Sequence, residues 1–138
     1  MTAELTSEVS RRLESDRYGW LTTVAKSGQP VPRLVWFFFD GNQLTVYSMP
    51  NAAKVAHIKA HPRVSFSLDS DGNGSGVVVV GGEASVDAVD TDPTADARYQ
   101  AKYHDYARSM GMTEEFLAAF NTRIKISIDK VWTTPTAE

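Results

Sequence analysis

The sequence predicts a single domain of the α+β or all-β class, built on an antiparallel barrel or sheet. Two observations support this fold class. Six runs rich in β-branched and aromatic residues are separated by turn residues, and helical patterns interrupt them without the regular β-α alternation of a parallel sheet. The chain has 138 residues with no internal repeat and no linker, so we expect one domain over residues 1–138.

The composition excludes several classes of function. The chain contains no cysteine, which rules out disulfides, thiolate nucleophiles and cysteine-ligated metals. Its net charge is -3 with acidic and basic residues interspersed, which argues against a nucleic-acid partner. The N-terminal segment is too charged for a signal peptide, and the apolar runs are too short to span a membrane. We therefore expect a cytoplasmic protein.

The first part of the chain predicts one helix followed by three strands. Apolar residues recur every four positions around Thr6 and Ser7, at Leu5, Val9 and Leu13. Three strand-like runs follow, YGWLTTVA at 18–25, PVPRLVWFFF at 30–39 and QLTVYS at 43–48. KSGQ separates the first two runs, and Asp40-Gly41, a strong hairpin signal, separates the last two. The three strands are expected in meander order.

A short lysine-bearing helix is expected between the third and fourth strands. The segment PNAAKVAHIKAH follows Ser48, and Asn51 is a favourable N-cap. RVSFSLD at 63–69 and VVVVGGEASVDAV at 77–89 predict two further strands joined by the loop DSDGNGSG. Gly81-Gly82 inside the second of these predicts a bulge or a close approach of another backbone or ligand.

The last part of the chain predicts two helices and a sixth strand. Asp92-Pro93 is typical of an N-cap followed by proline at the first helical position, and the helix should run about seventeen residues to Gly111. This helix carries Tyr99, Tyr103 and Tyr106 at helical spacing. Thr113 should cap a second helix, which has Phe116, Leu117 and Phe120 on one side. RIKISIDKVWT then alternates as a strand, with Ile124, Ile126 and Ile128 on one face.

Two patterns suggest metals but are outweighed by simpler interpretations. The loop DSDGNG supplies the first half of a calcium loop, yet Val80 stands where the bidentate glutamate should be, and strands flank the loop. His57 and His61 have zinc-ligand spacing, but Ile58 replaces the glutamate of the metalloprotease pattern and no third ligand is near in sequence. A hairpin loop and a solvated histidine pair are favoured, so no metal is expected.

Lys54 is the residue of the lysine helix that most suggests a ligand. It falls in the first helical turn, where free backbone N–H groups and the positive end of the helix dipole already favour an anion. A lysine there is locally unfavourable by a few tenths to about 1 kcal/mol unless an anion such as a phosphate occupies the site. The alternative is an ordinary lysine on a solvated helix face. The preceding run adds Trp36, Phe37, Phe38 and Phe39, which could form a buried strand or a wall for a flat ring system.

Together these segments resemble the split β-barrel flavin and deazaflavin proteins related to pyridoxamine phosphate oxidase. The resemblance covers nearly the whole chain, through GQPVPRLVWFFFDGNQLTVYS, PNAAKVAHIKAHPRVSF, VVVVGGEA and RIKISIDKVW in this order. It implies a mainly β, six-stranded antiparallel split barrel with flanking helices. It also implies a symmetric homodimer, with two cofactor sites at the subunit interface.

The resemblance further implies roles for particular residues. Lys54 matches the family lysine that meets the cofactor phosphate. The strand along the isoalloxazine ring and its tail is matched by Arg33, Leu34, Val35 and Trp36, and the turn at the ribityl and phosphate portion by Ser48, Met49 and Asn51. Gln29 and Pro30 lie in the first hairpin near the ring, whereas Arg123 and Trp132 would come from the other subunit.

Departures from the family pattern bear on the cofactor. Ala52, Ala53 and Phe38 stand where true pyridoxamine phosphate oxidases have a serine, an arginine and a further lysine, and the arginine-rich C-terminal ending of those enzymes is missing. Oxidation of vitamin B6 is therefore disfavoured. The chain is most similar to the short actinobacterial members, in which the strand reads much like PxxxLVWF and the cofactor is the deazaflavin F420. Flavin mononucleotide (FMN) is the alternative.

The implied activity is hydride transfer between the reduced deazaflavin and a small organic substrate, with the protein supplying orientation and a dry pocket. The sequence identifies no catalytic residue and does not choose a proton donor among water and Tyr99, Tyr103 and Tyr106. A non-catalytic carrier of the cofactor or of a related tetrapyrrole is the alternative from another class.

Overall fold

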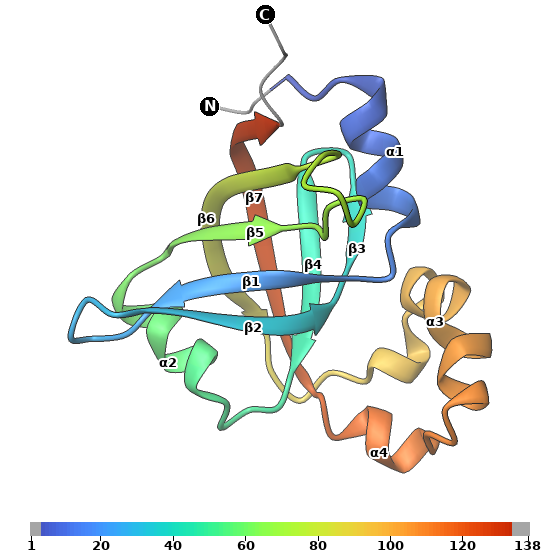
Figure 1. Cartoon of the computed structure of the whole chain (residues 1–138). Helices are drawn as coiled ribbons and strands as arrows, with labels where there is room; N and C mark the ends of the chain where they lie inside the picture. The colour runs from blue at the N-terminus through green and yellow to red at the C-terminus, as the bar shows by residue number, and fades with distance from the viewer. Residues whose placement is uncertain (1–3, 134–138) are drawn as a thin grey trace, which may run out of the picture.

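The computed structural model describes residues 4–133, which form a seven-stranded sheet with helices around it (Figure 1). The strands are β1 (Tyr18–Val24), β2 (Pro30–Trp36), β3 (Phe38–Asp40), β4 (Gln43–Ser48), β5 (Arg63–Ser67), β6 (Val78–Ala88) and β7 (Thr122–Thr133). Their order in the sheet is β2-β1-β5-β6-β7-β4-β3, and neighbouring strands pair antiparallel. The expected mainly β, α+β class with flanking helices is confirmed.

The run PVPRLVWFFF forms two strands, so the expectation of six strands was wrong by one. β2 ends at Trp36 and β3 begins at Phe38, yet these two strands lie at opposite edges of the sheet. A single residue, Phe37, joins the two edges, so the sheet must curl until its edges meet (Figure 1). The result is an open, curved antiparallel sheet compatible with a split barrel.

The corner at Phe37 is held by the third helix. The Phe37 side chain is fully buried, so its backbone groups need partners inside the protein. The Tyr103 hydroxyl accepts from the Phe37 N–H at 2.7 Å, and it lies 2.6 Å from the carbonyl oxygens of both Phe37 and Arg17. Lys102 Nζ also donates to the Phe37 carbonyl at 2.8 Å. Lys102 and Tyr103, which are consecutive residues of one helix, therefore supply hydrogen-bond partners for the Phe37 backbone groups at the break between the two strands.

Within residues 4–133, the helices beside the sheet are α1 (Ser7–Ser15), α2 (Ala53–Ala60), the 3-10 helix η1 (Pro93–Ala95), α3 (Ala97–Ser109) and α4 (Glu114–Ala118). As expected, α1 presents one apolar stripe, with Val9 and Leu13 buried, and Thr113 caps α4. The single long helix expected after Asp92 is wrong in one respect. Asp92 caps only η1, and a second cap at Asp96 accepts from two backbone N–H groups to start α3.

The cap expected for the lysine helix was also wrong. Ala52, rather than Asn51, occupies the N-cap position of α2, and its side chain forms no capping hydrogen bond. The helix packs against β1 and β6, with Val55 and Ile58 buried. Packing of this apolar face therefore holds the helix, and its N-terminus is left open to other partners.

The paired glycines of β6 form the expected irregularity. The pairing of β6 with β7 shifts register between Gly81 and Gly82. A Cβ atom added at Gly82 would lie 2.0 Å from the backbone oxygen of Ser127, which no side chain could tolerate. Glycine is required here because the two backbones approach too closely for any other residue.

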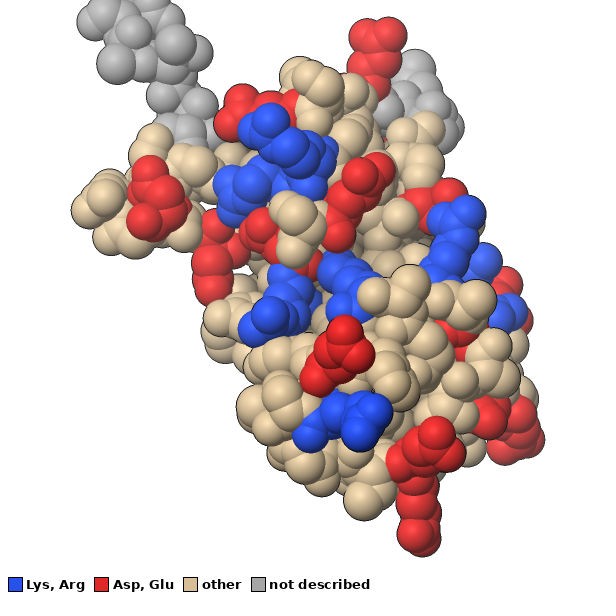
Figure 2. Space-filling model, turned by 90° about the vertical axis from the view of Figure 1, so that its right-hand side faces the viewer, with Lys and Arg blue, Asp and Glu red and all other residues tan. Residues whose placement is uncertain are grey.

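The surface on the side of α3 carries mixed charge. Figure 2 shows basic and acidic side chains interspersed over this face. Ion pairs account for part of the pattern, since Arg98 lies 2.9 Å from Asp40 and Arg12 lies 3.1 Å from Asp16. This face therefore offers no large patch of a single sign. None of the described helices is long and apolar enough to cross a membrane.

Candidate functional site

An apolar cavity of about 220 Å³ lies where β2 meets α2, α3 and α4, and we call it the β2 cavity. Four of the residues expected at a ligand site line it, namely Leu34, Val35, Trp36 and Lys54. The other walls come from β4, α3 and α4 and are mostly aromatic or aliphatic. The fold therefore gathers the aromatic strand and the helix lysine, which are eighteen residues apart in sequence, around one space.

The aromatic wall of the β2 cavity is held rigid by α3. The Trp36 ring stacks on the Tyr103 ring with a centroid distance of 4.5 Å and an interplanar angle of 9°. Tyr99 and Tyr106 contact the same indole at 6.4 Å and 5.5 Å in tilted arrangements. Three tyrosines from about two turns of the helix thus fix the indole, which is a suitable wall for a flat ring.

Lys54 lines the β2 cavity, and Arg33 is an exposed residue of β2 that does not line it but whose charge acts on Lys54. Lys54 is half-buried, and its pKa is lowered below the ordinary value by burial and, to a lesser degree, by the charge of Arg33. Within residues 4–133, neither Lys54 nor Arg33 has an acidic partner. The open N-terminus of α2 adds free N–H groups beside Lys54. Like charges held together at a helix N-terminus make a favourable place for an anion.

The remaining residues expected near the cofactor tail lie outside the β2 cavity. Ser48 is buried and donates its hydroxyl to the Met49 carbonyl, whereas Met49 and Asn51 are exposed in the turn that leads to α2. Gln29 and Pro30 are exposed at the far end of β2, roughly 20 Å from Trp36 for an extended strand. The structure therefore brings Lys54 together with the strand residues from Leu34 to Trp36, and leaves Ser48 buried outside the cavity and the other turn and hairpin residues on the surface.

Arg123 and Trp132 lie toward opposite ends of β7. They are nine positions apart, which is about 30 Å along a strand, and neither lines the β2 cavity of its own chain. The Arg123 guanidinium is engaged within its own chain, since Nε donates to Asp87 at 2.6 Å. Trp132 is exposed beside Gly81. The expectation assigns both side chains to a neighbouring subunit, and it stays a prediction.

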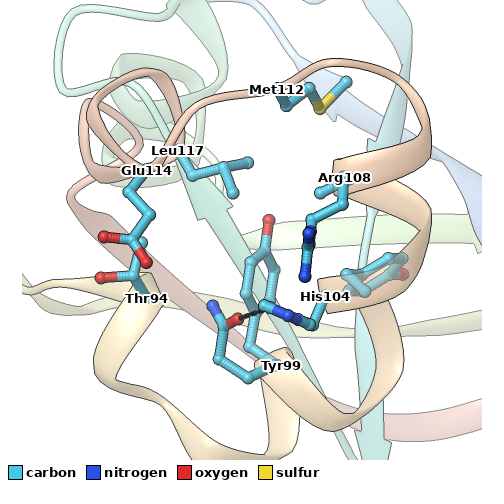
Figure 3. Close-up of a pocket in the computed structure, with 10 residues that line it drawn as sticks. Thr94, Tyr99, His104, Arg108, Met112, Glu114 and Leu117 are labelled. Carbon is cyan, nitrogen blue, oxygen red and sulfur yellow. Dashed lines mark hydrogen bonds between the residues drawn. The ribbon is translucent and has the colours of Figure 1, made fainter.

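A second cavity of about 290 Å³ adjoins the first, between η1, α3 and α4 (Figure 3), and we call it the α3 cavity. It shares three lining residues with the β2 cavity, namely Tyr99, Met112 and Leu117. Its mouth is polar, with His104 and Arg108 on one side and Glu114 and Thr94 on the other (Figure 3). The sequence analysis did not predict this cavity, because it depends on how α3 and α4 pack against each other.

The tyrosines around the two cavities are neutral acids at ordinary pH. Burial is the main cause that raises the pKa of Tyr47 and of Tyr99 to about 12, and it raises the pKa of Tyr103 further. The Tyr47 hydroxyl donates to Asp96 at 2.6 Å, and the Tyr103 hydroxyl is engaged at the Phe37 corner. These two hydroxyls therefore serve the fold.

The patterns that suggested metals have structural explanations. Among residues 4–133, no three His, Asp or Glu side chains are grouped to hold a metal ion. In the loop after β5, one Asp71 carboxylate oxygen accepts from the N–H groups of Asn73 and Ser75. His57 Nδ1 lies 2.8 Å from the hydroxyl of the buried Thr23. The loop is closed by its own backbone, and this histidine is part of the packing between α2 and β1.

The curved antiparallel sheet, with a cavity beside its open edge, defines a protein of the split-barrel class. The chain belongs to the pyridoxamine 5'-phosphate oxidase family, because the family profile of that description matches residues 5–134. The family assignment therefore covers all seven strands. No curated protein matches the chain.

Solved structures agree with this fold. One described as an F420 reductase is 24% identical with a TM-score of 0.70, and the match covers 93% of this chain and 98% of that one. A FAD-binding protein from Mesorhizobium loti is 26% identical with a TM-score of 0.64, covering 92% and 90%. The heme storage protein HutZ from Vibrio cholerae is 12% identical with a TM-score of 0.61, covering 91% and 89%. Proteins whose descriptions name different cofactors therefore share this fold.

Proposed function

We propose that the chain is an oxidoreductase that holds the deazaflavin F420 in the β2 cavity and transfers hydride between the reduced cofactor and a small organic substrate. The observation that carries this proposal is Lys54, a half-buried cation in the wall of an otherwise apolar and aromatic cavity, which has no acidic partner among residues 4–133 and is near the charge of Arg33. A ligand with a flat ring and a phosphate satisfies both parts of this cavity. The likeness to the structure described as an F420 reductase supports the same cofactor.

Each part of the site has a task under this proposal. Lys54, Arg33 and the open N-terminus of α2 bind the phosphate. Leu34, Val35 and Trp36 orient the ring, and the turn with Ser48, Met49 and Asn51 receives the tail, with Gln29 and Pro30 at the approach. The bound deazaflavin supplies the hydride chemistry, while the apolar walls exclude water and fix the distance to the substrate.

F420 is preferred over FMN because positively charged and hydroxyl partners for the FMN phosphate are missing. Ala52 and Ala53 flank the start of α2 and contribute no polar side chain. Phe38, in the place of a further lysine, packs into the aromatic cluster of Tyr47, Tyr99 and Tyr103. One lysine and one arginine leave a weaker phosphate site than the family's full set, so the ring and tail must contribute more of the affinity.

We further propose that the active form is a homodimer joined through the outer face of the sheet. The pairing registers place Leu34, Trp20, Ser67, Val79 and Trp132 in one cross-strand row over β2, β1, β5, β6 and β7. Leu34, Trp20 and Trp132 are 50%, 42% and 51% exposed, which is unusual for large apolar side chains grouped together. Leu34 also lines the β2 cavity, so a second copy on this row would lie at the edge of the cofactor site and could bring Arg123 and Trp132 to it.

The activity is tested by mixing the protein with reduced F420 and a panel of quinones, enones and tetrapyrroles while deazaflavin oxidation is followed by absorbance. We expect turnover of at least one compound in the panel. Binding of F420 without turnover across the panel would favour a carrier, and a tetrapyrrole that binds while F420 does not would favour the heme-type alternative.

A further inference from the structure

The structure separates the three tyrosines of α3 by the environment of their hydroxyls. The Tyr103 hydroxyl is engaged with the backbone at Phe37 and Arg17. Tyr106 lines neither cavity, and its ring lies 3.9 Å below the Arg17 guanidinium. Tyr99 lines both cavities. One of the three is therefore placed to meet a ligand.

The Tyr99 hydroxyl is free although its residue is almost completely buried. Tyr99 is 5% exposed, and no hydrogen bond to its hydroxyl is formed by residues 4–133. Within the same part of the chain, every fully buried side-chain nitrogen or oxygen has a partner. The Tyr99 oxygen must therefore face the open space of the cavities. In Figure 3 the ring projects from α3 with its hydroxyl on the side of Leu117 and Met112, which are the other residues shared by the two cavities.

This position lies at the boundary between two spaces of different character. The β2 cavity is lined by mostly apolar side chains and by Lys54, whereas the α3 cavity opens through a polar mouth. If the cofactor fills the first space, a substrate can approach its ring through the second, and the two meet beside Tyr99. A phenol at that point remains protonated well above neutral pH, since burial raises its pKa to about 12. It is suited to donate to a neutral acceptor such as a carbonyl oxygen.

We infer that Tyr99 is the residue that positions the substrate, by donating a hydrogen bond to a carbonyl oxygen of a flat compound that enters through the α3 cavity. This inference rests on the proposed function, since it names the residue that positions the substrate of the same site. The hydrogen bond polarises the carbonyl group toward hydride acceptance and fixes the ring against the cofactor.

The test uses 2-methyl-1,4-naphthoquinone as the probe and the oxidised cofactor, so that no turnover occurs. The carbonyl stretching band of the bound quinone is recorded by infrared difference spectroscopy for the wild type, Tyr99→Phe and Tyr106→Phe. Tyr106→Phe is the matched control, because it removes a hydroxyl from the same helix outside both cavities. We expect the band to lie at lower wavenumber in the wild type and Tyr106→Phe than in Tyr99→Phe.

A second measurement uses affinity. Calorimetric titrations compare the quinone with 2-methylnaphthalene, which has the same ring system without carbonyl oxygens. Tyr99→Phe should weaken the quinone by roughly three- to tenfold and leave the hydrocarbon unchanged. Equal band positions in the three proteins, an equal loss for both ligands, or no saturable quinone binding would each overturn the inference.

The same titrations without cofactor keep this inference separate from the proposed function. If F420 does not bind, the proposed function fails, and the quinone titrations of the cofactor-free wild type, Tyr99→Phe and Tyr106→Phe still decide the role of Tyr99. If F420 binds and the quinone shows no dependence on Tyr99, only the inference fails.

Discussion

At the scale of single residues, Lys54 is the side chain whose surroundings most favour a bound anion. It is half-buried in the first turn of α2 and near a second cation, and both features lower the pKa of its amino group. Without an anion this arrangement costs stability, and with one it contributes affinity. The same change should therefore affect the apo protein and the complex in different ways.

Changing Lys54→Ala should weaken the proposed cofactor roughly ten- to a hundredfold, because a charge-assisted contact of about 1.5 to 3 kcal/mol is lost. The apo protein should melt at the same temperature or slightly higher. Lys59→Ala is the matched control, since it removes the same charge from the exposed last turn of α2. Unchanged affinity in Lys54→Ala would make Lys54 an ordinary surface lysine and would move the phosphate site toward Arg33.

Tyr103 shows how a residue can serve the fold where the sequence left its role open. Changing Tyr103→Phe removes the acceptor of the buried Phe37 N–H, whereas the Phe37 carbonyl keeps Lys102 as a donor. We expect a loss of about 1 to 3 kcal/mol in the free energy of unfolding, measured by urea denaturation. Tyr106→Phe should change it by far less, and an equal loss in the two variants would contradict this account of the corner.

At the scale of elements, the aromatic cluster between α3 and the sheet should make stability sensitive to alkali. Tyr47 and Tyr99 ionise near pH 10 when unfolded, and burial raises the pKa of each to about 12 in the folded protein. Between these values the folded state binds more protons than the unfolded state. The stabilising contribution is therefore complete below pH 10 and is lost as the pH rises through 12.

We expect the free energy of unfolding of the wild type to fall above pH 10. Tyr103→Phe removes another buried phenol of raised pKa, so its free energy should fall less steeply over the same range. Urea denaturation at intervals between pH 8 and 11.5 checks both statements. A wild-type profile that stays flat to pH 11.5 would contradict them.

Most elements could be predicted because their signals are local. Periodic apolar residues, caps such as Thr6 and Thr113, and the Asp40-Gly41 turn act within a few residues. The break at Phe37 could not be predicted in this way, since it depends on the closure of the sheet and on Tyr103, which is sixty-six residues away. The start of α3 was missed because Asp92 and Asp96 are both good caps. In the structure Asp92 caps η1 and Asp96 caps α3.

The candidate site was predictable to a similar degree. Lys54 and the strand from Leu34 to Trp36 carry local signals of a helix terminus and an aromatic run, and they do line one cavity. The contribution of α3 and α4 was missed because the free hydroxyl of Tyr99 and the engaged hydroxyl of Tyr103 look alike in sequence. Only tertiary packing tells them apart.

At the scale of the whole molecule, the exposed apolar row on the sheet carries the proposed assembly. Trp20 lies in this row between Leu34 and Ser67, and its large exposure means that a charge there should leave the fold of one chain intact. We expect Trp20→Glu to convert a dimer at micromolar concentration into a monomer in sedimentation velocity. Val89→Glu is the control, because Val89 is 64% exposed but lies outside the row. A wild-type monomer at that concentration would remove the shared-site proposal.

The central claim is that the β2 cavity holds F420, and direct titration of the wild-type protein tests it most closely. Cofactor-free protein is titrated in parallel with F420 and with FMN, and bound ligand is measured by equilibrium dialysis. We expect saturable binding of one F420 per chain, with an affinity higher than that for FMN. Tighter binding of FMN, or no saturable binding of F420, would contradict the claim.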